Sequence, residues 1–130
     1  MVIIFQFALK LKDCIMIAIG DSLPDVVLGE YNAVEGTCAI GPTQIKVKEA
    51  AANKTIVIFA VPGAFTPTCS AQHAPGFIEH YDEFKAAGVD EIWCLSVNDA
   101  FVLGAWGKQL GTAGKIRMIA DGDATFTKAT

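Results

Sequence analysis

The stretch from Val61 to Ser70, VPGAFTPTCS, places a cysteine three residues after a threonine, directly after an uncharged run and a Pro-Gly pair. If a helix starts at Thr66 or Thr68, Cys69 lies in its first turn, where free backbone N–H groups and the positive end of the helix dipole favour an anion. The sulfur is then biased towards thiolate, the reactive form. The Thr66 hydroxyl is close enough to hydrogen-bond the sulfur or an oxygen bound to it, and Pro62 stiffens the approach.

This motif contains a single thiol. Enzymes that shuttle a disulfide carry C-x-x-C, whereas this sequence has threonine in place of the first cysteine, so Cys69 is better suited to attack an oxidant. Buried cysteines often only fill space, and the Thr-Pro-Thr flank at a helix start is what favours a chemical role here. Cys94, beside Trp93 in an apolar run, is predicted to pack, with a resolving thiol as the alternative. No pattern marks Cys14 or Cys38.

Two further side chains are candidates for the same site. His73 follows Cys69 by four residues, which on a continuous helix would allow a Cys-His pair or half a metal site. Pro75 disturbs that geometry and the sequence offers no second ligand pair, so His73 is predicted to be a polar edge residue and no metal is expected. Arg117, the only arginine, lies inside the apolar run KIRMIA. Either its stem packs while its head reaches water, or its guanidinium points at a buried anion such as a thiolate.

The elements that must position these residues follow from hydrophobic patterning. Apolar runs predict buried strands at 55–61 (TIVIFAV), 91–97 (EIWCLSV) and 115–120 (KIRMIA). An amphipathic pattern predicts a helix over 76–87, and Asn98 and Asp99 are candidate caps for a second helix that ends near Leu110. Alternating strands and helices indicate an α/β fold with a mainly parallel sheet and helices on its faces. Catalytic and ligand-binding residues lie at the carboxyl ends of such strands, and Cys69 follows the first of these ends.

Composition narrows the class of protein. The 130 residues suffice for one compact domain, predicted over residues 16–130, with residues 1–15 as an N-terminal extension. The net charge of −4 provides no basic field for phosphates, so no nucleic-acid partner is expected. Four widely spaced cysteines indicate separate thiols in a reducing compartment, hence a cytoplasmic location, although an even count is also compatible with disulfides. The opening apolar run is short and carries its lysines after rather than before it, so neither export nor membrane association is expected.

The residues PGAFTPTCS, with Pro62, Thr66 and Cys69 in the order P-x-x-x-T-x-x-C, resemble the active-site signature of the peroxiredoxins. The continuations GVDEIWCLSVNDAFVLGAWGK and GKIRMIADGDATFTKA are similar to the type-five subfamily in its bacterial form, and the similarity extends from Met16 to Ala129. The resemblance implies a thioredoxin-like fold and thiol-dependent reduction of hydrogen peroxide and organic hydroperoxides.

The resemblance also implies a role for each matched residue. Cys69 would be the peroxidatic thiol that becomes a sulfenic acid, Thr66 would hydrogen-bond the peroxide and the thiolate, and Pro62 would shield the pocket. Arg117 would stabilise the thiolate and the transition state. The family implies no bound cofactor, an external reductant such as glutathione with a glutaredoxin, or thioredoxin, and a homodimer formed through surfaces near the active site.

Two features depart from the family pattern. The opening residues match nothing in it, and the chain stops at Thr130, where family members continue through a helix, a strand pair and a closing helix. Some members carry a resolving cysteine in that part. The sequence is therefore similar to a C-terminally truncated peroxiredoxin, in which one sheet edge and part of the core would be uncovered.

Two other interpretations stay open. A thiol-disulfide oxidoreductase on the same fold is the nearest enzyme alternative, and T-x-x-C in place of C-x-x-C argues against it. A non-catalytic redox-fold fragment that binds a partner is the other, supported by the short C-terminal part.

Overall fold

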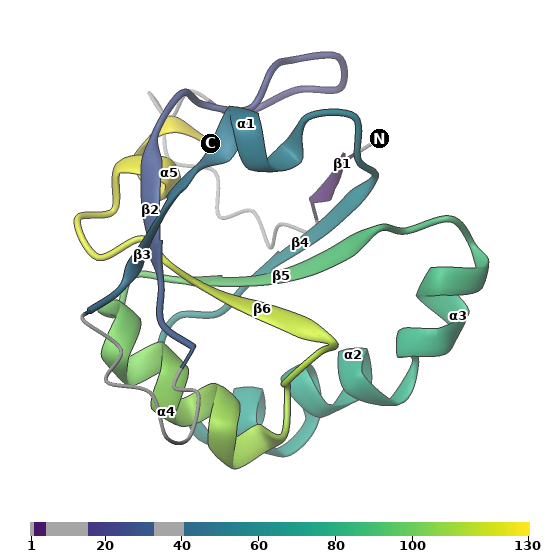
Figure 1. Ribbon diagram of the computed structural model, residues 1–130, viewed down its shortest axis with the longest axis vertical. Helices are drawn as coiled ribbons and strands as arrows, with labels where there is room; N and C mark the ends of the chain where they lie inside the picture. Colours follow the sequence, from purple (N-terminus) through teal and green to yellow (C-terminus); the bar gives the residue numbers. More distant parts are fainter. Residues whose placement is uncertain (1, 5–15, 33–40) are drawn as a thin grey trace.

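The computed structural model describes residues 2–4, 16–32 and 41–130, which form a six-stranded sheet with helices on both faces (Figure 1). The strand order is β1-β4-β5-β6-β2-β3. The first four strands of that order are parallel. Beyond β6, β2 runs antiparallel to β6, and β3 runs antiparallel to β2. The strands are β1 (Val2–Ile4), β2 (Val27–Glu30), β3 (Thr43–Lys46), β4 (Ile56–Ala60), β5 (Glu91–Ser96) and β6 (Ile116–Ala120). The predicted α/β fold with a mostly parallel central sheet is confirmed.

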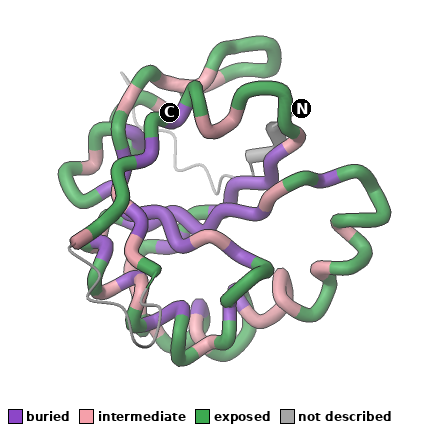
Figure 2. The backbone as a smooth tube through the Cα atoms, viewed as in Figure 1, coloured by how far each residue is buried: buried purple, intermediate pink, exposed green. Residues whose placement is uncertain are grey.

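The three central strands are those that the apolar runs predict. β4, β5 and β6 are buried along nearly their whole length (Figure 2) because helices cover both of their faces. Because these three strands are parallel, their carboxyl ends lie at the same end of the sheet. Val61, directly after β4, donates its N–H to the Leu95 carbonyl at 3.0 Å, which keeps the two chain segments together where the Cys69 loop begins.

Two apolar clusters lie on opposite faces of the sheet. One contains Cys69 and Cys94 and is covered by the π-helical turn η1 and the helices α2, α3 and α4. The other contains Trp93 and is covered by α1 and α5. The helical elements are α1 (Val47–Ala51), η1 (Cys69–His73), α2 (Ala74–Glu79), α3 (Tyr81–Ala86), α4 (Ala100–Leu110) and α5 (Thr125–Ala129).

Helix boundaries follow local capping chemistry. The predicted second helix is α4: the Asp99 carboxylate accepts from the Val102 N–H at 3.0 Å, and Gly111 ends the helix with φ +72°. The helix predicted over 76–87 is instead two short helices, α2 and α3, that meet at His80. A turn after β6 leads into α5, whose start is held by the buried Asp121 carboxylate, which accepts from the N–H of Phe126 and of Thr127.

The N-terminal strand lies at the outer edge of the sheet. Val2, Ile3 and Ile4 pair in parallel with Ile56, Val57 and Ile58 of β4. These three residues belong to the segment predicted as an extension, and residues 5–15, with Cys14, lie outside the described residues. The division at residue 16 stays a prediction. In the part of the chain that the structure describes, no helix has the length and apolar character needed to cross a membrane.

Close packing between α4 and the segment after β2 depends on the missing side chain of Gly104. A Cβ at this position would lie 2.6 Å from the Tyr31 carbonyl oxygen, a backbone atom that cannot move aside cheaply. We expect Gly104→Ala to lower the free energy of unfolding by about 1–3 kcal/mol. Gly76→Ala, in α2 with open space around it, is the matched control and should be neutral or stabilising. Urea denaturation compares the two, and equal stability of both variants would contradict the close contact.

Candidate active site

Cys69 lies in the first turn of a helix, as predicted. Pro67 and Thr68 are already helical, and the Ser70 N–H donates to the Thr66 carbonyl at 2.9 Å, so Thr66 immediately precedes the helix. Proline suits the first helical position because its ring fixes a helical φ and its missing N–H has no partner there. Cys69 then begins a π-helical turn, closed by the Ala74 N–H on the Cys69 carbonyl. The sulfur-bearing residue thus sits among unpaired helix N–H groups.

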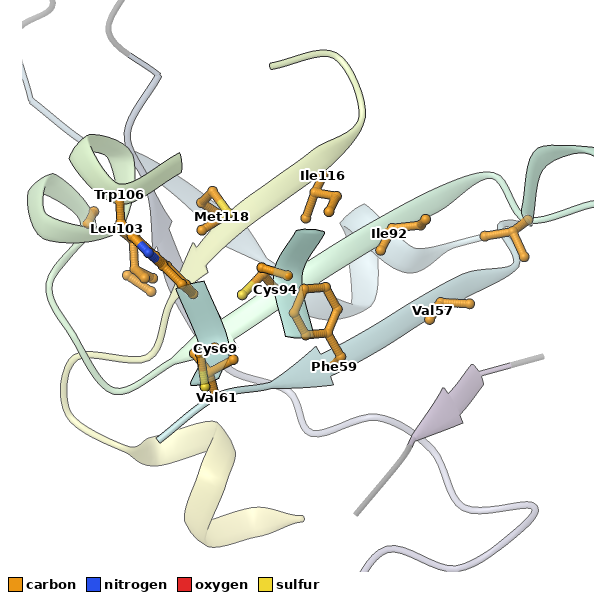
Figure 3. Packing of buried hydrophobic residues seen from close by; sticks show 14 residues of the cluster. Val57, Phe59, Val61, Cys69, Ile92, Cys94, Leu103, Trp106, Ile116 and Met118 are labelled. Atoms are coloured by element: carbon orange, nitrogen blue, oxygen red, sulfur yellow. The ribbon is translucent and has the colours of Figure 1, made fainter. Parts of the chain in front are cut away.

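The Cys69 side chain is buried, with a relative exposure of 7%. It packs in the same cluster as Phe59 of β4, Val61 directly after β4, and Cys94 of β5, and Figure 3 shows these side chains together. Both cysteines are free thiols. Burial, and secondarily the charge of Cys69, raises the pKa of the Cys94 thiol to about 12. Cys94 therefore stays protonated, in agreement with its predicted packing role.

The loop from Pro62 to Thr66 carries the chain from β4 to the helix of Cys69. Phe65 adopts a left-handed conformation with φ +61°, which a non-glycine residue adopts only when its surroundings hold it there. The Thr66 hydroxyl donates to the Gly63 carbonyl at 2.9 Å, and the Ala64 N–H donates to Asn98 Oδ1 at 2.8 Å. The loop is thus fixed from within and from the end of β5.

Helix α4 contributes the outer wall of this region. The fully buried Trp106 donates its indole N–H to Ser70 Oγ at 3.0 Å, and the Phe65 ring lies 6.4 Å from the Trp106 ring between centroids. Ser70 directly follows Cys69, so a change at the sulfur takes place next to this indole. Pro62, predicted to shield the pocket, is exposed. Thr66 is partly buried, and its hydroxyl donates to the Gly63 carbonyl.

The structure does not bring Arg117 to Cys69. Arg117 lies on β6 between Ile116 and Met118, whose side chains pack in the cluster of Cys69. Because successive side chains of a strand alternate between its faces, the guanidinium projects to the opposite face. There Nε and Nη2 donate to the Glu30 carboxylate at 3.0 and 2.6 Å. The expectation that Arg117 points at the thiolate is wrong, since the buried anion that it meets is Glu30.

A connected polar network surrounds Arg117. Its Nη1 donates to Glu91 Oε2 at 2.9 Å, and its guanidinium lies 5.3 Å from the centroid of the Trp93 ring. Glu91 also accepts from the Trp93 indole at 2.7 Å and from Lys54 Nζ at 2.6 Å. Partial burial opposes ionisation of Glu91, but the hydrogen bonds from Lys54, Trp93 and Arg117 outweigh it and lower the pKa to about 2. Hydrogen bonding to Glu30 raises the pKa of Arg117.

His73 is exposed at the end of the π-helical turn, as predicted for a polar edge residue. Its ring lies 5.2 Å from the Phe59 ring between centroids. Within the described ranges, no group of three or more histidine, cysteine or acidic residues could hold a metal ion. Cys38 lies outside the described residues.

The described residues line a groove along the helices that follow Cys69 and another groove at the sheet. One of about 770 Å³ runs beside the helix of Cys69, lined by Thr68, Gln72, His73, Phe77 and Phe84 among others. The other, of about 700 Å³, lies at the amino ends of β5 and β6, next to Glu91 and Arg117. Neither is lined by Cys69, which agrees with the burial of its sulfur.

Sequence reasoning missed two residues of this region. Asn98 was predicted only as a candidate cap, yet Asp99 caps α4 and Asn98 hydrogen-bonds the loop of residues 62–66. The bond from the Trp106 indole to Ser70 has no sequence signal because 36 positions separate the two residues.

The chain is similar in sequence to a known protein family and to its curated members. The Redoxin family model matches residues 18–130. Peroxiredoxin-2C of Oryza sativa is 47% identical over 113 residues, which cover 87% of this chain and 67% of that protein. The chain spans less than half of some other curated relatives.

Solved structures are similar over the same region. Reduced Prx3 of Vibrio vulnificus, in complex with hydrogen peroxide, is 50% identical with a TM-score of 0.79, covering 88% of this chain and 68% of that one. A Burkholderia cenocepacia protein described as a thioredoxin reductase is 60% identical with a TM-score of 0.81, at the same coverage of both chains.

Proposed function

Because this chain belongs to the peroxiredoxin family, we propose that it is a thiol-dependent peroxidase in which Cys69 reduces hydrogen peroxide and organic hydroperoxides. The observation that carries the proposal is the position of Cys69: a buried free thiol in the first turn of a helix, at the carboxyl end of β4. The unpaired N–H groups of that turn favour the thiolate and an oxygen developing negative charge beside it.

The proposed first step is a nucleophilic displacement. The Cys69 thiolate attacks the terminal oxygen of the hydroperoxide, a sulfur–oxygen bond forms, and the O–O bond breaks. The leaving hydroxide or alkoxide takes a proton and departs as water or an alcohol, and the sulfur becomes a sulfenic acid. The Thr66 hydroxyl can turn from the Gly63 carbonyl to the incoming peroxide, since a hydroxyl rotates to suit its partner.

The proposed second step uses an external thiol. The sulfenic acid condenses with a reductant thiol to a mixed disulfide with release of water, and a further thiol frees Cys69. Glutathione with a glutaredoxin, or thioredoxin, is the proposed reductant, so the cycle needs no bound cofactor and suits the reducing cytoplasm. Cys94 is an unsuitable first partner because its thiol is fully buried and stays protonated.

The proposed assembly is a homodimer formed near the site. Three large apolar side chains are exposed at the end of the sheet where Cys69 lies: Phe65 after β4, Val97 after β5 and Phe101 at the start of α4, with relative exposures of 49%, 43% and 53%. Exposed apolar side chains at one end of a molecule suit association with a second copy. Sedimentation velocity of the reduced protein is the test, and a monomer at all concentrations would contradict the dimer.

Stopped-flow fluorescence tests the proposed activity. Reduced protein is mixed with a small excess of hydrogen peroxide while tryptophan emission is followed, with Trp106 next to Ser70 as the reporter. A fast change that consumes one peroxide per chain is expected. Reduction of insulin disulfides without peroxide consumption would instead support the thiol-disulfide oxidoreductase. A folded sample inactive in both assays would support the non-catalytic fragment.

A further inference from the structure

We infer that Asn98 is a positioning residue for the Cys69 reaction, because its side chain sets the conformation of the loop of residues 62–66. The inference rests on the proposed peroxidase function. Asn98 follows β5, and the loop follows β4, the neighbouring parallel strand. In the part of the chain that the structure describes, Asn98 is the one side chain from outside the loop that hydrogen-bonds it.

The two contacts of Asn98 fix the orientation of its amide. Oδ1 accepts from the Ala64 N–H at 2.8 Å and from Ser96 Oγ at 2.8 Å. A backbone N–H can only donate, so the atom that faces Ala64 must be the carbonyl oxygen. The Ser96 hydroxyl then donates to the second lone pair of the same oxygen. Because Ser96 is 1% exposed, this hydroxyl anchors the amide to the interior of the sheet.

The loop needs such an anchor. Phe65, next to Ala64, adopts a left-handed conformation that costs about 1–3 kcal/mol for a non-glycine residue and persists only where neighbouring contacts hold it. Thr66 and the first helical turn follow at once, so relaxation at Phe65 moves the Thr66 hydroxyl relative to the sulfur. Misplacement of reacting groups by about 1 Å can cost about a hundredfold in rate.

Removing the acceptor tests the inference. We expect Asn98→Ala to lower the second-order rate constant of Cys69 oxidation by about 10–100-fold. The Ala64 amide should also exchange its hydrogen faster, because its acceptor is gone. Asn98→Asp keeps an oxygen at the same place and should restore slow exchange at Ala64 and most of the lost rate.

The control is Asp99→Ala, one residue away. It removes the cap of α4 and costs about 1 kcal/mol of stability without touching the loop. Urea denaturation first establishes conditions in which all variants are folded. Equal oxidation rates of Asn98→Ala and Asp99→Ala in those conditions would overturn the inference, as would an Asn98→Asp variant no faster than Asn98→Ala. An unreactive wild-type protein would instead overturn the proposed peroxidase function, while the exchange rate at Ala64 would still report whether Asn98 holds the loop.

Discussion

Replacing Cys69 by serine is expected to abolish oxidation by peroxide, with a loss of at least about a thousandfold in the second-order rate constant. Serine is close in size to cysteine and so keeps the packing around residue 69, but its hydroxyl does not ionise near neutral pH and is a poor nucleophile. The measurement is the stopped-flow trace of tryptophan emission, with Trp106 as reporter through its bond to Ser70.

Cys94→Ala is the matched control for that prediction. Cys94 packs in the same buried cluster and its thiol pKa is raised to about 12, so removing it should leave the first oxidation unchanged. Alanine avoids placing an unpaired hydroxyl in an apolar position. If both variants lost activity to the same extent, the choice of Cys69 as the reacting thiol would be wrong.

The second large effect concerns stability. Arg117→Met is expected to lower the free energy of unfolding by about 3–5 kcal/mol, because it leaves the Glu30 carboxylate buried without its partner. The Glu30 side chain is 7% exposed and receives two hydrogen bonds from the guanidinium. Lys48→Met, which removes an exposed pair with Asp25 at 3.9 Å, is the control and should change stability by less than about 1 kcal/mol. Urea denaturation measures both.

The same variant separates a structural from a catalytic role of Arg117. Its guanidinium lies on the face of the sheet opposite to Cys69, so folded Arg117→Met should oxidise at the wild-type rate. A large loss of rate in a variant shown to be folded would place Arg117 in the reaction after all.

Glu91, which accepts hydrogen bonds from Arg117, Trp93 and Lys54, makes the stability of the protein depend on pH. Its pKa is about 2 in the folded protein, below the ordinary 4.5. A lowered pKa means that the folded state favours the carboxylate, so this contribution is fully present above pH 4.5 and is lost as the pH falls towards 2. In Glu91→Gln, the fall in stability over this range should be smaller than in the wild type. Urea midpoints at several pH values compare them, and identical slopes would contradict the role of Glu91.

Local patterns were sufficient for the central strands and for the helix start at Cys69. The run TIVIFAV lacks any charge and must be buried on both faces, and Asp99 caps α4 by an interaction within one turn. These features depend on neighbours in sequence, which is why the sequence predicts them. The position of Cys69 belongs to this group, because Pro67 and the chain that follows it define the first turn locally.

The sequence predictions for Arg117 and Asn98 failed for physical reasons. For Arg117, the motif match identified the residue but not the face of β6 on which its side chain lies, although Ile116 and Met118 on either side both pack towards Cys69. For Asn98, two adjacent cap-forming residues carry the same local signal, and the contact that distinguishes them crosses 34 positions of sequence. Interactions between distant segments decided both cases.

The outermost strand, β1, is hydrogen-bonded to the strand that precedes the Cys69 loop. Residues 2–4 pair with Ile56, Val57 and Ile58, and the carboxyl end of that same strand leads to the loop of residues 62–66. An affinity sequence fused ahead of Val2 is therefore attached to a neighbour of the strand that delivers Cys69. The oxidation rates of tagged and untagged protein would show whether a change at β1 reaches that loop.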